Sequence, residues 1–132
     1  MATAHATLSN FRQAPRKMRM VADSIRGKKV SEALINLDFM PKKASQPIKT
    51  LIQSALANAK AQDITLDNLI VKVIKVDSGK ILYRRRPAAR GSAHPVRKRT
   101  SRIFVQLTEN PVIKSVKSKA RKVNAKPTLK TL

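Results

Sequence analysis

Residues 82–99 read LYRRRPAARGSAHPVRKR, and this stretch decides the fold. It is too charged to be buried in a core and too long to be a tight turn. The segments on either side, Leu69–Val76 and Ile103–Leu107, are rich in β-branched residues, which predicts two strands. We therefore expect these strands to continue outward as a β-hairpin arm over about residues 77–102. With about ten residues on each side at roughly 3.3 Å per residue, the arm projects on the order of 30 Å.

The sheet at the base of this arm is predicted from alternating patterns. Ile103, Val105 and Leu107 alternate with polar or larger residues, which indicates one buried face. His5–Phe11 alternates weakly, with Ala6 and Leu8 on one side, and predicts a first strand. An isolated two-stranded ribbon is only marginally stable in water, so the arm needs a partner to lie against.

Two short helices are predicted after the first strand. Pro15 fits the first position of a helix, where its missing N–H has no cost, and Gly27 is a natural end. Ser31 is the predicted cap of the next helix, which Pro41 ends. The inward positions of the two helices are Met18, Val21, Ala22, Ile25, Ala33, Leu34 and Leu37.

A third, longer helix is predicted over about Lys42–Ala61. Pro47 removes one intrahelical hydrogen bond, so the helix either bends there or begins near Ser45. Its apolar stripe comprises Ala44, Ile48, Leu51, Ile52, Ala55, Leu56 and Ala59.

Together these patterns predict an α+β fold: three helices packed on a three-stranded antiparallel sheet, with a long protruding β-hairpin. Residues 1–109 form the domain, and residues 110–132, which have no periodicity, form a flexible basic tail. The expected core comprises Met18, Val21, Ile25, Leu34, Leu37, Leu51, Ile52, Ala55, Leu56, Ile103 and Val105.

Charge indicates the class of partner. The chain has 29 Lys+Arg against 7 Asp+Glu, a formal net charge of +22. Residues 78–108 contain 9 basic residues and no acidic one, and the 7 basic residues after Glu109 are again unbalanced. Such an excess calls for a polyanion, either nucleic acid or an anionic membrane surface. The membrane alternative lacks aromatic anchors, with no Trp, 3 Phe and 1 Tyr, so a phosphate backbone is the better partner.

The candidate RNA-binding residues are the basic side chains of the first helix region and of the arm. Arginine supplies 7 of the arm's 9 basic residues and lysine 6 of the tail's 7, which favours an ordered arm and a more loosely held tail. The candidates are Arg12, Arg16, Lys17, Arg19, Arg26, Lys28, Lys29, Lys80, Arg84, Arg85, Arg86, Arg90, Arg97, Lys98, Arg99 and Arg102.

Enzymatic function has little support. The acidic residues are scattered, His5 and His94 lie far apart, cysteine is absent, and the chain has only 3 glycines. We therefore expect no catalytic residues, no metal and no cofactor. The first residues lack the pattern of a signal peptide and no apolar run suits a membrane span, so we expect an intracellular protein with no membrane partner.

A second class of binding protein fits the same composition. A DNA-compacting protein with a basic β-arm would also neutralise phosphates, because this interaction is indifferent to the sugar. Such proteins are usually symmetric dimers. A monomer that prefers folded RNA would favour the RNA interpretation, for which no homo-oligomer is expected.

Three stretches together resemble one family. These are Pro15-Arg16-Lys17-Met18-Arg19 through Ile25-Arg26-Gly27-Lys28, then Ser54-Ala55-Leu56-Ala57-Asn58-Ala59, and finally Arg86-Pro87-Ala88-Ala89-Arg90-Gly91 to Lys98-Arg99-Thr100-Ser101. In this order and spacing, residues 2–109 resemble the bacterial-type large-subunit ribosomal protein L-twenty-two family. The resemblance implies a structural protein of cytoplasmic ribosomes, with an organellar ribosome as the alternative.

The resemblance also implies partners and a role for the arm. The partners are 23S-type rRNA (ribosomal RNA), neighbouring large-subunit proteins and the nascent peptide, and the protein would aid subunit assembly. The tip of the arm would line the peptide exit tunnel with Leu82, Tyr83, Arg84, Pro87, Ala88, Ala89, Arg90 and Gly91.

Two features depart from the family pattern. Ala14 stands where the family usually has Ser, so the first helix should lack a capping hydroxyl. The tail after Glu109 extends beyond the usual end.

Overall fold

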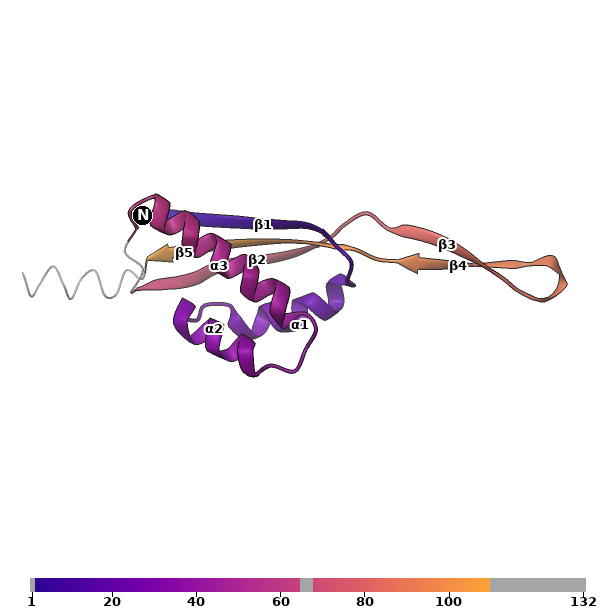
Figure 1. The fold of residues 1–132 in the computed structure, drawn as a ribbon, viewed down its shortest axis with the longest axis horizontal. Helices are drawn as coiled ribbons and strands as arrows, with labels where there is room; N and C mark the ends of the chain where they lie inside the picture. The colour runs from indigo at the N-terminus through magenta and orange to yellow at the C-terminus, as the bar shows by residue number, and fades with distance from the viewer. Residues whose placement is uncertain (1, 65–67, 110–132) are drawn as a thin grey trace, which may run out of the picture.

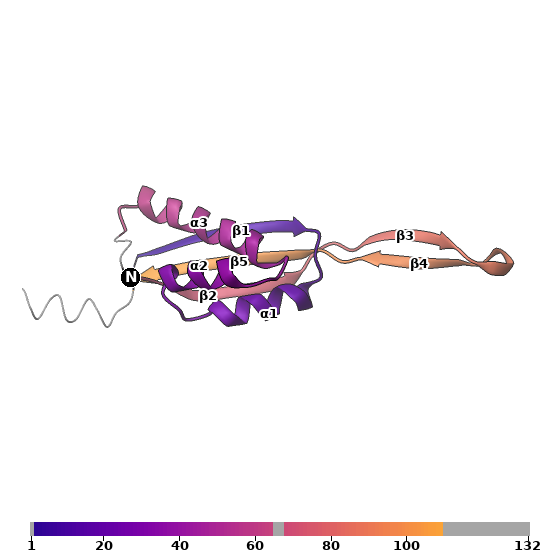
Figure 2. The ribbon, with the colours of Figure 1, turned by 60° about the horizontal axis from the view of Figure 1, so that its bottom comes forward.

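The computed structural model describes residues 2–64 and 68–109. Its globular part is a three-stranded antiparallel sheet of order β1-β5-β2, formed by β1 (Thr3–Phe11), β5 (Ser101–Glu109) and β2 (Leu69–Ser78). Three helices, α1 (Pro15–Ile25), α2 (Val30–Phe39) and α3 (Ser45–Ala61), pack on one face of this sheet (Figures 1 and 2). The predicted α+β fold is confirmed.

The arm is a second, separate sheet. β3 (Leu82–Pro87) pairs antiparallel with β4 (Ala93–Lys98), and the short helix η1 (Ala89–Gly91) joins them. The arm extends away from the end of the main sheet opposite the start of β1 (Figure 1). The strands β2 and β5 do not run continuously into the arm. Residues 79–81 separate β2 from β3, and residues 99–100 separate β4 from β5.

The core lies between the helices and the inner face of the sheet. Nine of the eleven predicted core residues are buried, whereas Leu34 and Leu56 are only partly buried against it. These two side chains border a surface groove between α2 and α3, which the periodicity of either helix alone does not reveal. The confirmed core residues are Met18, Val21, Ile25, Leu37, Leu51, Ile52, Ala55, Ile103 and Val105.

Helix boundaries follow the predicted signals with one exception. Pro15 opens α1 after Ala14, which makes no side-chain capping bond, and Gly27 follows the helix at a φ of 77°. The third helix begins at Ser45, so Pro47 lies in its first turn, where no intrahelical N–H is needed.

The predicted cap of the second helix is wrong. Ser31 lies inside α2, whose N-cap is Lys29. Lys29 forms an isolated bridge with Ile70, and its carbonyl accepts a hydrogen bond from the Ala33 N–H at 2.9 Å. These backbone contacts fix where the helix begins without a capping side chain.

Replacing Ile52 by Ala is expected to lower the free energy of unfolding by about 2–5 kcal/mol, because Ile52 is fully buried. Ile35 is 56% exposed, so Ile35→Ala removes the same atoms with a change within about 0.5 kcal/mol. Urea denaturation of both variants measures the difference. Equal losses would mean that the face of α3 is not the core.

Candidate nucleic-acid interface

The arm has no core of its own. Every residue of β3 is exposed, and in β4 only Val96 is partly buried. Cross-strand pairing runs from Leu82 with Lys98 to Pro87 with Ala93. Burial of apolar side chains therefore contributes little to holding this ribbon, and a binding partner has to supply the contacts that stabilise it.

Basic side chains project from both faces of the arm. Residues paired directly across an antiparallel ladder share a face, and the face alternates along each strand. One face therefore carries Arg84, Arg86 and Lys98, and the opposite face carries Arg85 and Arg97. A protein lying on a flat polyanionic surface would need cations on one face only. The arrangement suits an arm with phosphates on both sides.

The turn of the arm lies at residues 88–92. The Ala88 N–H donates to the Ser92 carbonyl at 2.9 Å, and between them Arg90 and Gly91 adopt φ values of 60° and 70°. Glycine adopts this left-handed conformation at no steric cost, so Gly91 suits the turn. Of the residues assigned to the tip from sequence, Pro87, Ala88, Ala89, Arg90 and Gly91 lie at or next to this turn.

The prediction that three further residues lie at the tip of the arm is wrong. Leu82, Tyr83 and Arg84 begin β3 at the base of the arm, where they pair with Lys98, Arg97 and Val96. The family motif gives the order of residues along the chain, whereas the position of the turn is set by residues 88–92.

A close contact joins the arm to the sheet. The Gly79 N–H donates to the Thr100 carbonyl at 2.9 Å, and the buried Thr100 hydroxyl donates to the Lys80 carbonyl at 2.6 Å. A Cβ on residue 79 would lie 2.5 Å from the Thr100 Oγ1. The junction therefore has no room for a side chain at Gly79.

Replacing Gly79 by Ala is expected to displace the Thr100 hydroxyl and break its bond to Lys80, which lowers the free energy of unfolding by about 1–3 kcal/mol. In a Thr100→Ala background the same change should cost much less, because the clashing oxygen is gone. Thermal unfolding of the single and double variants measures the coupling. Additive losses would contradict the contact.

Two of the candidate arginines contact their own sheet. Arg19 Nε donates to the Val76 carbonyl at 3.1 Å and Arg26 Nη2 donates to the Ile74 carbonyl at 3.3 Å, both on the edge strand β2. Arg26 also pairs with Asp23 at 2.9 Å. These guanidinium groups therefore cover an open strand edge, and only their remaining donors face outward.

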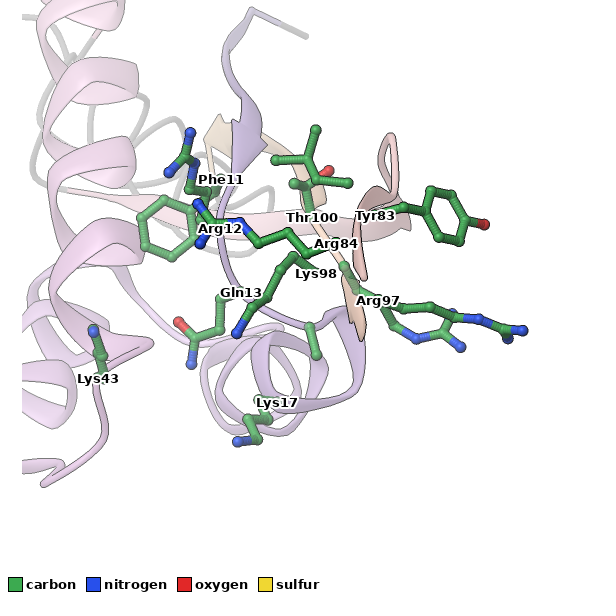
Figure 3. Close-up of a pocket in the computed structure, with 13 residues that line it drawn as sticks. Phe11, Arg12, Gln13, Lys17, Lys43, Tyr83, Arg84, Arg97, Lys98 and Thr100 are labelled. Carbon is green, nitrogen blue, oxygen red and sulfur yellow. The ribbon is translucent and has the colours of Figure 1, made fainter. Parts of the chain in front are cut away.

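The other candidates on the globule and at the base of the arm are exposed. They are Arg12, Arg16, Lys17, Lys28, Lys29, Lys80, Arg99 and Arg102. Six of the candidate RNA-binding residues meet at one groove. Arg12, Lys17, Arg84, Arg97, Lys98 and Arg99 border it (Figure 3), together with Lys43, Phe11 and Gln13, which were not predicted from sequence. Periodicity within one element does not reveal these three residues as neighbours, because the fold brings them together where β1 ends beside the arm.

Other kinds of site are not evident in the part of the chain that the structure describes. Among residues 2–64 and 68–109, no three His, Cys, Asp or Glu side chains gather as metal ligands. Within the same ranges, none of the helices has the length and apolarity to cross a membrane.

Comparison with known proteins agrees with this geometry. The family described as ribosomal protein L22p/L17e matches residues 6–108. A protein of Desulfitobacterium hafniense named large ribosomal subunit protein uL22 is 48% identical over 110 residues, which cover 83% of this chain and 96% of the relative. Proteins of the same name from Desulfotalea psychrophila and Christiangramia forsetii are 48% and 46% identical, covering 81% of this chain and 98% and 82% of theirs. Since the match spans both the globular part and the arm, the chain belongs to the ribosomal protein L22p/L17e family, whose members are structural ribosomal proteins and not enzymes.

Proposed function

We propose that this protein binds 23S-type rRNA as a constituent of the large ribosomal subunit and aids its assembly. The observation that carries the proposal is the arm, which has cations on both faces and almost no buried side chains. A ribbon of this kind gains its stability and its charge balance from RNA that surrounds it. Membership of a ribosomal family supports RNA binding over the alternative of a DNA-compacting dimer.

Recognition depends on backbone phosphates and RNA shape. Arginine forks suit bidentate contacts with phosphates, and the low aromatic content argues against a stacking platform along a single strand. The exposed basic residues of α1, of the loop at residues 26–29 and of the arm supply the contacts. The partly engaged Arg19 and Arg26 contribute through their free donors.

The tip of the arm is proposed to line the peptide exit tunnel. Residues 87–91 are the farthest from the globule along both strands of the arm, and they combine one cation with small side chains. Neighbouring large-subunit proteins and the nascent peptide are then the protein partners. Co-sedimentation with large subunits in a salt-washed gradient tests whether the protein is a constituent of the large subunit. A protein found only in the free fraction would oppose that part of the proposal.

The basic tail, residues 110–132, lies outside the described residues and keeps its proposed role as a further rRNA contact. Removing residues 112–132 takes away the tail's 7 basic residues and leaves the described core intact, so rRNA affinity should fall while unfolding stays cooperative. Binding titrations and thermal melts of the truncated protein measure both effects. Loss of cooperative unfolding would show that the tail packs against the domain.

A further inference from the structure

A groove of about 580 Å³ lies where the end of β1, the start of α1 and the base of the arm meet. A volume of this size lies within the roughly 300–1,000 Å³ that small-molecule sites occupy. Its charged lining is cationic, with no Asp or Glu among the described residues that border it. The cations are Arg12, Lys17, Lys43, Arg84, Arg97, Lys98 and Arg99.

An irregularity in β1 builds one wall of the groove. The pairing of β1 with β5 shifts between Leu8 and Phe11, and Asn10 adopts a φ of 55°. Such bulges redirect the side chains that follow them. The Gln13 N–H then donates to the Phe11 carbonyl at 2.8 Å, which forms a tight turn. In Figure 3 the Phe11 ring and the ends of Gln13 and Lys98 are directed to the same side of the arm's base, whereas Tyr83 and Arg97 extend to the other side.

The side chains of this wall combine an aromatic ring with an unsatisfied amide. Phe11 is only partly buried, so part of its ring is open to the groove. The Gln13 Oε1 is buried and has no hydrogen-bond partner among residues 2–64 and 68–109. Buried amide oxygens nearly always have a partner, and a side-chain amide presents both an acceptor and two donors. The groove therefore offers a ring and several cations beside a side-chain amide whose buried oxygen is unpaired.

We propose that this groove holds one unpaired nucleotide of the rRNA, with its base against the Phe11 ring and the Gln13 amide and its phosphates on Arg12 and Lys98. Unpaired bases are read by stacking on side-chain rings and by hydrogen bonds to their edges, whereas bases stacked and paired in an RNA helix have no free face and expose only their groove edges. An acidic protein segment would also satisfy the cations, but a base combines a flat face for the ring with donors and acceptors for the amide in one rigid group. The inference rests on the proposed rRNA binding and names a site within it.

The first test places a photoreactive residue at Phe11. Full-length protein carrying Phe11→p-benzoylphenylalanine is assembled into large subunits and irradiated. We expect crosslinks to one rRNA nucleotide that lies in a loop or bulge. A crosslink to another protein, or to many nucleotides equally, would overturn the proposal.

The second test compares matched glutamines. Gln13→Glu places a carboxylate where the base and phosphates lie, and affinity for rRNA should fall roughly tenfold, as for loss of one base contact. Gln46→Glu adds the same charge at an exposed position of α3 outside this groove and should have little effect. In subunits with Gln13→Glu, chemical probing should find the crosslinked nucleotide newly reactive and other protected positions unchanged.

The outcomes separate this site from the proposed function. Lys98→Gln alters only an exposed arm residue, so it tests the groove even if Gln13→Glu disturbs α1, and it too should expose the same nucleotide. Equal behaviour of the Gln13 and Gln46 variants, with no nucleotide newly reactive in either Gln13→Glu or Lys98→Gln subunits, would refute the nucleotide site. Absence of rRNA binding by the unaltered protein would instead refute the proposed function.

Discussion

Raising the salt concentration from 50 to 200 mM is expected to lower the affinity of this protein for rRNA by roughly 10³- to 10⁵-fold, if six to ten phosphates are neutralised. The reason is release of counterions from the RNA by a chain of net charge +22 whose arm presents cations on both faces. Fluorescence anisotropy with a labelled rRNA fragment, repeated across salt concentrations, measures the slope. A flat response would mean that the basic excess is not the binding surface.

The contribution of single charges to this slope can be separated. Arg85→Gln and Arg97→Gln, on one face of the arm, should each reduce the slope by about one unit if the residue contacts a phosphate. Lys49 is a matched control, because its ammonium lies 2.5 Å from Asp38 and is already neutralised within the protein. Lys49→Gln should leave the slope unchanged.

Shortening the arm should separate the role of the tip from that of the domain. Replacing residues 84–96 by Asn-Gly keeps the pairs of Leu82 with Lys98 and Tyr83 with Arg97, and closes them with a two-residue turn. The free energy of unfolding should change by no more than about 0.5 kcal/mol, because the removed side chains lie outside the core. Subunits should still incorporate the protein through its remaining basic surfaces.

The tunnel is where the shortened arm should have its largest effect. Without residues 87–91 the narrow part of the tunnel should widen, and a map of subunits carrying the short protein measures its radius. A full-length variant, Arg84→Gln with Arg90→Gln, keeps the bulk of the arm and should leave the radius nearly unchanged. An unaltered radius with the short arm would remove the tip from the tunnel wall, whatever happens to rRNA binding.

Patterns within single elements predicted most of the fold. Met18, Val21 and Ile25 recur at helical spacing and are buried, and Ile103 and Val105 alternate and are buried, because each period brings one face to the core. The family resemblance and the absence of enzymatic function are confirmed by the family to which the chain belongs.

What sequence did not predict depends on contacts between elements. The start of α2 is fixed by the contact of Lys29 with β2 and not by Ser31. Phe11, Gln13 and Lys43 border one groove, where the irregular end of β1 meets the segment between α2 and α3 and the base of the arm. The periodicity of a single element does not predict contacts between residues that lie far apart in the sequence.

The junction at Gly79 and Thr100 has a consequence for evolution of the tip. The arm acts as a lever about 30 Å long, so a tilt of about 10° at its base displaces the tip by roughly 5 Å. That displacement is comparable to the size of a side chain. A substitution at Gly79, Lys80 or Thr100 can therefore change the surroundings of residues 87–91 as strongly as a substitution within those residues. Inherited changes in the behaviour of the tip should be sought at this junction as well.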